Sequence, residues 1–228
     1  PTEGTIVIGG KEYSKLTPKD SYENGISVIY QELSVINELS IQENLFVGKL
    51  PMKKVGIASV VDYAEMNKKA KELLAKIGLK RDPKTFVEDI SVSEKQQVEI
   101  AKALAADSKV IVMDEPTAML EPRGRKEVMQ TVKMLKEKLG ITVVLITHYM
   151  DEAVQADRVV VMNDGRTVLD GTPREVFSDV EKIKSLGLDV PQAPELAYKL
   201  HKSGFPVDYN VLNETECAQS VLKALGVQ

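Results

Sequence analysis

The spacing of apolar residues predicts strand-forming regions at both ends of a long helical stretch. Residues 4–10 (GTIVIGG) predict a strand that ends in a hairpin turn, and residues 26–30 predict a buried strand. From residue 40 to about residue 104, the apolar spacing is typical of helices, with Gly78 as one expected stop. One helical face within this stretch is expected to carry Met66, Ala70, Leu73, Leu74 and Ile77.

Strand and helix alternate after this helical insert. Residues 110–113 and 141–147 predict buried strands, and residues 122–139 between them predict an amphipathic helix. A hairpin is expected over residues 159–169, with its turn at Asn-Asp-Gly. Two further helices are expected around 194–202 and 214–225. Parallel strands joined by helices, with a helical insert, predict a doubly wound α/β fold with a helical subdomain.

Short polar residues followed by an acid three positions later predict where helices begin. The side chain of such a residue accepts a hydrogen bond from the backbone of the acid, whose carboxylate reaches back to the cap. The expected N-caps are Thr17, Ser40, Ser59, Thr172 and Asn213.

Composition and charge exclude several classes of protein. Of 228 residues, 43% are hydrophobic and 28% charged, which is a globular rather than a disordered balance. The net charge of −4 argues against nucleic acid as the main ligand. The longest uncharged stretch, residues 139–150, is too short to cross a bilayer. A single cysteine fits a reducing compartment, and a start at Pro1 without a signal peptide suggests a removed amino end or a fragment.

Two adjacent acids, Asp114 and Glu115, follow the apolar strand at residues 110–113. The carboxyl ends of strands are where α/β sheets bind ligands, and one acid there can hold Mg²⁺ while its neighbour orients an attacking water. Strands that end in acids are common, so the pattern alone also fits a purely structural role.

A second candidate site lies at the start of the helix that follows Ile90. Ser91 and Ser93 can cap this helix, which leaves the positive end of its dipole available to an anion. An ordinary capped helix is the simpler alternative. Gln31 and His148 also follow predicted strands, and a lone histidine there is more often structural than catalytic. His201, in a lysine-bearing helix, is expected on a solvated face.

Taken in order, these motifs resemble those of the ATP-binding cassette (ABC) ATPases of membrane transporters. The matching segments are Gln31, Ser91 within Ser-Val-Ser-Glu-Lys-Gln-Gln, Asp114-Glu115-Pro-Thr-Ala, and Ile-Thr-His148. The resemblance covers essentially the whole chain. It implies a P-loop NTPase-like parallel sheet with a helical subdomain, ATP and Mg²⁺ as cofactors, and a location on the cytoplasmic face of the membrane. It also implies two kinds of partner, a second ABC ATPase subunit (homodimer or heterodimer) and transmembrane permease subunits, and no nucleic acid.

The resemblance implies a role for each matching residue. Gln31 would contact the metal and the attacking water, and Asp114 would hold Mg²⁺. Glu115 would act as the general base, and His148 would contact the γ-phosphate. Ser91 would contact the γ-phosphate of a nucleotide held mainly by the other subunit.

The sequence departs from the family pattern in three places. Ser93 stands where the signature segment usually has glycine, and Glu121 stands where the loop after the Asp-Glu pair usually has aspartate. By the same resemblance, Ser93, Glu94 and Glu121 are expected to contact the nucleotide. No Gly-Lys-Ser or Gly-Lys-Thr occurs, so the phosphate-binding Gly-x-x-x-x-Gly-Lys-Ser/Thr loop (Walker A) is missing. The segment from Gly4 to Lys11 has the wrong spacing and reads as a strand. The loop is therefore expected upstream of residue 1, which would make this an amino-terminally truncated cassette.

Two branches of the family are represented along the chain. Residues 1–121 resemble sugar importers of the ribose and galactose type, and residues 122–228 resemble the ATPases of energy-coupling factor importers for vitamins and metal ions. The resemblance divides the chain into a partial ATPase core (1–31), a helical subdomain (32–106), the remaining core (107–171) and a helical extension (172–228). The sequence leaves open two other functions, a non-hydrolysing interaction protein and a cassette ATPase of DNA repair or translation.

Overall fold

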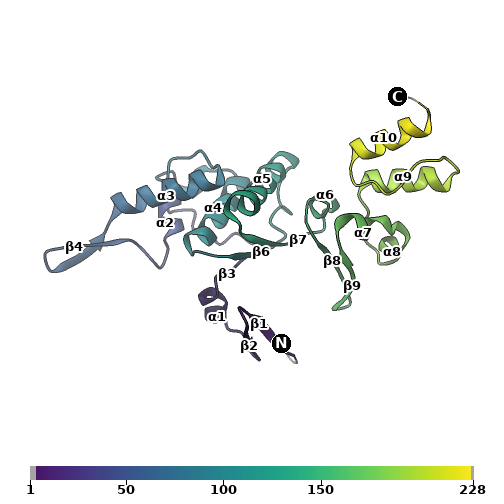
Figure 1. The fold of residues 1–228 in the computed structure, drawn as a ribbon. Helices are drawn as coiled ribbons and strands as arrows, with labels where there is room; N and C mark the ends of the chain where they lie inside the picture. Colours follow the sequence, from purple (N-terminus) through teal and green to yellow (C-terminus); the bar gives the residue numbers. More distant parts are fainter. Residues whose placement is uncertain (1–3, 227–228) are drawn as a thin grey trace. The chain divides into compact units, whose positions relative to one another are not determined.

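The computed structural model describes residues 4–226, which form two compact units that meet between Ile146 and Thr147. The first unit contains β1 to β7 with α1 to α5, and the second contains α6 to α10 with the hairpin β8–β9 (Figure 1). In the described part of the chain, no helix is both long and apolar enough to cross a membrane.

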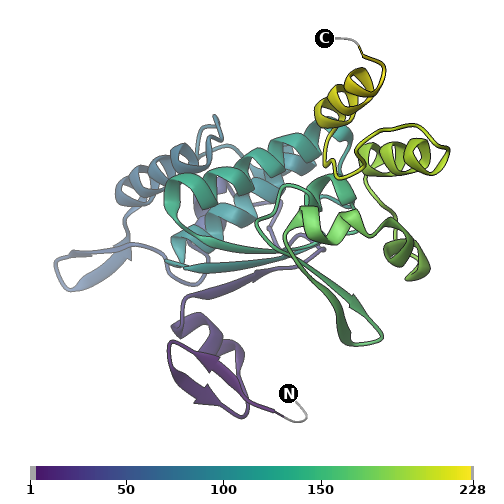
Figure 2. The ribbon, with the colours of Figure 1, turned by 45° about the vertical axis from the view of Figure 1, so that its right-hand side comes forward.

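A three-stranded parallel sheet forms the centre of the first unit. Its strands are β3 (Ile26–Ile29), β6 (Val110–Asp114) and β7 (Thr142–Ile146), in the order β3-β6-β7. The chain returns between them through α4 (Val92–Ala105) and α5 (Pro122–Leu139), which lie on one side of the sheet (Figure 2). This arrangement confirms the predicted α/β fold with a parallel sheet.

Within the described residues of the first unit, helices pack on one face of this sheet. Ile111 and Met113 point to the covered face and are fully buried among residues of α4 and α5. Positions on the other face are open to solvent: Val28 is 44% exposed, Val144 46% and Ile146 48%. The prediction of buried strands was therefore wrong for one face of β3 and β7, because their side chains alternate between a packed and an open face.

The helical region of the first unit packs on α4. It contains α2 (Ile41–Leu45), α3 (Tyr63–Ile77) and a 3₁₀ turn, Val87–Asp89. The predicted face of α3 is confirmed, because all five of its expected residues are buried. The helix ends at Gly78, as predicted, where a φ of 76° suits glycine.

A hairpin interrupts the stretch that was predicted to be wholly helical. Strands β4 (Met52–Val55) and β5 (Ala58–Val61) pair antiparallel around a two-residue loop of Gly56 and Ile57. The predicted N-cap at Ser59 was also wrong, because Ser59 lies in β5 and pairs with a residue of β4. Asp62 caps α3 instead, since its carboxylate accepts hydrogen bonds from the second and third helical residues.

The amino-terminal segment is a hairpin followed by a short helix. Strands β1 (Ile6–Ile8) and β2 (Lys11–Tyr13) pair antiparallel, and α1 (Pro18–Glu23) begins at the predicted N-cap Thr17. Gly9 and Gly10 form the turn, both with positive φ. The segment from Gly4 to Lys11 is thus a β-hairpin, which agrees with its rejection as a phosphate-binding loop.

The second unit has two small cores. The hairpin of β8 (Val159–Asn163) and β9 (Arg166–Gly171) packs with α7 (Pro173–Ser178) and α8 (Val180–Ser185), beside α6 (Met150–Ala153). Helices α9 (Gln192–Lys202) and α10 (Glu214–Ala224) form the other core, which includes the single, buried Cys217. The predicted hairpin and the caps Thr172 and Asn213 are confirmed. His201 is exposed, as predicted.

Candidate functional site

Three predicted site residues lie at or just after the ends of two adjacent strands, at one edge of the central sheet. Residues Ile29 of β3 and Met113 of β6 are register partners, so the two parallel strands end side by side. Asp114 closes β6, Glu115 comes directly after it, and Gln31 follows β3 at an exposed position. The fold therefore brings an amide and two carboxylates to the carboxyl edge of the sheet, where α/β proteins bind ligands.

Asp114 belongs to the open face of the sheet. Its register partner is Ile146, and both lie one position beyond the buried row that contains Met113. Because successive side chains of a strand point to opposite faces, Asp114 points away from α4 and α5. Asp114 itself is half-buried.

Glu115 has a backbone conformation that is rare for its type. Its φ is +44°, a left-handed value that costs most side chains about 1–2 kcal/mol. Two hydrogen bonds fix it there, since its N–H donates to the carbonyl of Ile146 at 3.0 Å and its carbonyl accepts from Ala118 at 3.1 Å. Strained residues of this kind concentrate at functional sites, where they aim a side chain.

The donor set at this edge suits one type of metal site. Among the described residues, no group of three or more His, Cys, Asp or Glu side chains could hold a metal ion by itself. Mg²⁺ often binds through one or two carboxylates, several waters and the phosphates of a nucleotide. Asp114 and Gln31, which stand at the ends of paired strands, fit such a shared site and not a closed protein cage.

The start of α4 holds the predicted signature residues in a closed capping box. Ser91 is the N-cap; its Oγ accepts from the Glu94 N–H at 3.3 Å, and its own N–H donates to Glu94 Oε2 at 2.9 Å. Arg81 also donates to Glu94 through Nε at 2.6 Å and Nη2 at 3.1 Å. Burial raises the pKa of Glu94, but these hydrogen bonds outweigh it and leave the pKa below its ordinary value. The positive end of the α4 dipole therefore already has a negative charge beside it, the carboxylate of Glu94.

Ser93 is turned inward toward α5. It is buried, and its hydroxyl donates to Glu127 Oε2 at 3.0 Å and lies 3.0 Å from the Ser91 Oγ. Opposite it stands Gly124 of α5, where a Cβ would come within 3.1 Å of the Ser93 Cβ. The side chain at this position is therefore accommodated by a glycine on the neighbouring helix. A nucleotide contact by Ser93 stays a prediction.

Glu121 and His148 take exposed positions at the starts of two helices. Glu121 is the N-cap of α5, and its side chain makes no capping hydrogen bond within the described helix. His148 belongs to the second unit and precedes α6. Its loop is held by Thr147, whose hydroxyl donates to buried Glu152 at 2.7 Å and accepts from the Tyr149 N–H at 2.9 Å. The proposed contacts of both residues with nucleotide stay predictions.

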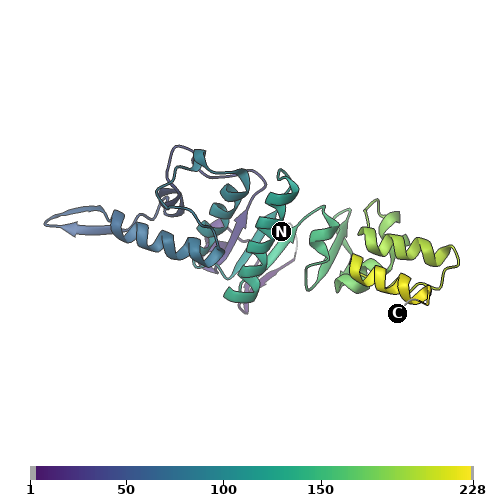
Figure 3. The ribbon, with the colours of Figure 1, turned by 90° about the horizontal axis from the view of Figure 1, so that it is seen from above.

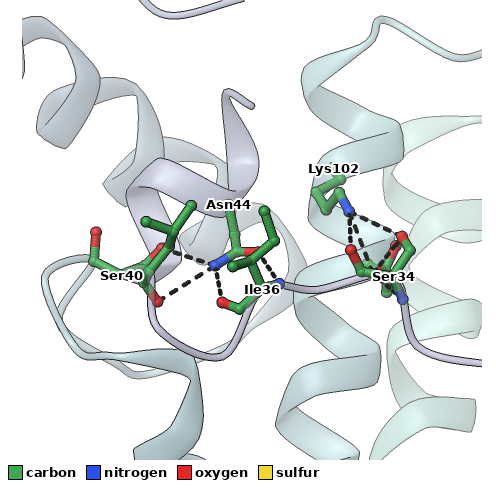
Figure 4. A network of polar contacts seen from close by, with 7 residues as sticks. Ser34, Ile36, Ser40, Asn44 and Lys102 are labelled. Carbon is green, nitrogen blue, oxygen red and sulfur yellow. Dashed lines mark hydrogen bonds and ion pairs between the residues drawn. The ribbon is translucent and has the colours of Figure 1, made fainter. Parts of the chain in front are cut away.

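A partly buried polar network that the sequence analysis missed holds the segment after Gln31. Asn44 of α2 accepts from the Ile36 N–H at 2.8 Å and donates to the Ile36 carbonyl at 2.9 Å (Figure 4). Ser34 donates to Glu99 of α4 through its N–H at 3.0 Å and its hydroxyl at 2.8 Å. The signal was a glutamate inside an apolar helix segment, which needs buried partners. This network ties the loop beyond Gln31 to both helices.

Comparisons with known proteins agree with this geometry. Residues 1–118 match the model of the family described as "ABC transporter". The energy-coupling factor transporter ATP-binding protein EcfA1 of Clostridium perfringens is 50% identical over 161 residues, 71% of this chain and 57% of that protein. EcfA1 of Clostridium novyi is 38% identical over 224 residues, 97% of this chain and 77% of that protein. The C. perfringens alignment thus spans a little over half of that relative.

Relatives of the other expected kind are also found, together with solved structures. The galactose/methyl galactoside import ATP-binding protein MglA of Clostridium tetani is 38% identical over 189 residues, 82% of this chain and 37% of that protein. The structure of cbiO1 from C. perfringens, described as part of the ABC transporter complex cbiONQ, aligns with a TM-score of 0.66 and 27% identity. It covers 88% of this chain and 77% of that one. Both predicted resemblances, to sugar importers and to energy-coupling factor ATPases, are confirmed.

Proposed function

This chain belongs to the ABC transporter family, and from that we propose that it is the ATP-binding and ATP-hydrolysing subunit of an importer. The cargo would be a small solute, either a sugar or the cargo of an energy-coupling factor importer. The observation that carries the proposal is the sheet edge at which Gln31, Asp114 and strained Glu115 follow paired strands.

The chemistry follows from what these side chains can do. MgATP would supply the phosphoryl group and the metal that spreads its developing charge. Asp114 would hold the metal through its carboxylate. Glu115 would orient the attacking water and accept its proton, and the Gln31 amide would contact the same water. In this family resemblance, Ser91 would serve a nucleotide bound mainly by a second subunit, and His148 would contact its terminal phosphate.

Partners are proposed from the same relatives. The ATP-binding cassette MJ0796, with 27% identity and a TM-score of 0.59, was solved as a dimer bound to ADP and phosphate. The relative cbiO1 is part of a transporter complex. We propose that this chain pairs with a second ATPase subunit, that ATP closes the pair, and that permease subunits hold it at the cytoplasmic face of the membrane.

A non-hydrolysing interaction protein is the second candidate. The observation that favours it is the lack of Gly-Lys-Ser or Gly-Lys-Thr among the 228 residues. Such a chain would dock on a transporter or on a partner ATPase, without binding nucleotide tightly by itself and without completing the ATP site of that partner.

One mixing experiment separates the two candidates. The chain is titrated with MgATP by calorimetry, and is then mixed with an ABC ATPase that has an intact phosphate loop but an alanine in place of its signature serine. ATP hydrolysis that appears only in the mixture supports a direct role in the ATP site. We expect Ser91→Ala to abolish this hydrolysis and Ser203→Ala, at an exposed serine after α9, to leave it unchanged.

The other outcomes are equally informative. Hydrolysis in the mixture that survives Ser91→Ala would contradict the role assigned to Ser91. No hydrolysis and no MgATP binding, from a chain that associates with the ATPase, would favour the interaction protein. Tight MgATP binding by the chain alone would exclude it.

A further inference from the structure

The hairpin β4–β5 exposes apolar side chains at its tip and on both faces. Ile57, in its two-residue loop, is fully exposed, and Val55 next to the loop is 58% exposed. Met52 is 54% exposed and lies on the opposite face of the ribbon from Val55, because side chains alternate along a strand. Figures 1 and 3 show the ribbon extending away from α3.

The charge of this segment has one sign. Between Glu43 and Asp62, the only charged residues are Lys49, Lys53 and Lys54, although the whole chain carries a net charge of −4. The Nζ of Lys53 lies 3.7 Å from Oδ1 of Asp62 at the base of the hairpin. Lys54 is exposed on β4. The apolar tip is thus flanked by positive charge.

We propose that the tip of this hairpin inserts into the headgroup region of an anionic lipid membrane. Lys54 pairs with Ser59, so the residues from Val55 to Ala58 project beyond it by about two residues, or roughly 7 Å. Interfacial segments bury their apolar side by roughly 5–10 Å at the boundary between headgroups and acyl chains. With the tip at this depth, Lys54 would reach the lipid phosphates.

A lipid surface fits these observations better than a protein partner does. A protein partner would cover one face of the ribbon, whereas here apolar residues occupy the tip and both faces. A fluid apolar medium surrounds such a tip from all sides, and its anionic headgroups complement the exposed Lys54 beside the tip. The inference goes beyond the proposed function and does not depend on nucleotide.

The chain contains no tryptophan, so a single introduced tryptophan reports on its own surroundings. Ile57→Trp places the probe at the tip, where the exposed loop tolerates a larger side chain. We expect its emission to shift to the blue with phosphatidylglycerol vesicles, and to be quenched by lipids with brominated acyl chains. Phosphatidylcholine vesicles should give little shift. In the Ile57→Trp background, Lys54→Gln should lower the partition coefficient about fivefold, the usual contribution of one lysine at an anionic surface.

The hairpin β8–β9 provides the matched control. Its turn carries Asp164 and Gly165 in place of Gly56 and Ile57, so Asp164→Trp should show no lipid-dependent shift. Unchanged emission of the Ile57→Trp protein with anionic vesicles would overturn the proposal, as would equal shifts with both lipids. A blue shift that requires a permease in the bilayer would also overturn it, and would assign the hairpin to a protein. None of these results bears on ATP binding, because the assay contains no nucleotide.

Discussion

At the scale of single residues, Ser93 and Gly124 form a complementary pair across α4 and α5. The serine occupies a position where the resemblance predicts glycine, and its Cβ lies 3.1 Å from the place that a Cβ on residue 124 would take. Its hydroxyl is in turn held by Glu127. The identity of residue 93 therefore restricts the residue that α5 can carry opposite it.

This pair predicts that the effect of Gly124→Ala changes sign with residue 93. With Ser93 present, the added methyl group should cost about 1–3 kcal/mol of unfolding free energy through overpacking. In a Ser93→Gly background the contact disappears, and the same substitution should stabilise by about 1 kcal/mol because alanine favours helix. Urea unfolding of the four proteins measures both effects. Equal effects in the two backgrounds would show that Ser93 does not set the spacing.

The left-handed backbone of Glu115 predicts that substitutions at this position affect stability and activity differently. Alanine and glycine at this position both remove the carboxylate, but only glycine adopts a φ of +44° without strain. Glu115→Gly should therefore be more stable than Glu115→Ala by about 1 kcal/mol, measured by urea unfolding. Both proteins should lose the catalytic role proposed for the carboxylate. An alanine variant as stable as the glycine variant would show that the turn relaxes.

At the scale of elements, the start of α3 gives a direct test of which residue caps the helix. Asp62→Ala removes the carboxylate that accepts from Ala64 and Glu65, so it should lower the urea midpoint. Ser59→Ala, the matched change at the position predicted from sequence, should leave the midpoint almost unchanged. The reverse order of effects would restore the predicted cap.

The elements also show which parts of the fold could be predicted from sequence. Helix α3 and the caps Thr17 and Ser40 were predictable because a helix face and a capping box are local patterns. The hairpin β4–β5 was missed because its residues do not alternate between apolar and polar. Its signal was Gly56 between β-branched residues, a combination typical of tight hairpin turns.

The sequence could predict the candidate site only as far as it could predict which strands are neighbours in the sheet. Asp114 and Glu115 follow an apolar run, and a parallel neighbour brings Gln31 to the same edge. The open face of the sheet was not predictable, because an apolar strand has the same sequence whether one or both of its faces are covered. The inward turn of Ser93 depends on Glu127 and Gly124, which are distant in sequence, so local patterns could not show it.

At the scale of the whole molecule, the stability of the second unit is expected to depend on pH through Glu195. Hydrogen bonds from Lys184 and Lys199 lower the pKa of Glu195 to about 2, from an ordinary value of 4.5. A carboxyl group with a lowered folded-state pKa stabilises the fold above its unfolded pKa and loses that contribution as the pH falls. The loss here should run from about pH 4.5 down to about pH 2.

Glu195→Gln tests this dependence. The variant should be less stable than the unsubstituted protein at pH 7, and the difference should shrink between about pH 4.5 and about pH 2. Circular dichroism during urea unfolding at several pH values measures it, with Glu214→Gln at the exposed start of α10 as the control. A difference that stays constant over this range would contradict the assignment.

The buried thiol of Cys217 can report how often α9 and α10 separate. The side chain is 5% exposed within the core of α9 and α10, and burial raises its pKa, so both access and reactivity are low in the closed state. A thiol reagent should react only when α10 detaches, and the labelling rate then gives the frequency of that opening. Because the chain has no other cysteine, the signal needs no engineering. If a candidate partner lowers the labelling rate of Cys217, then binding of that partner makes the separation of α9 and α10 rarer.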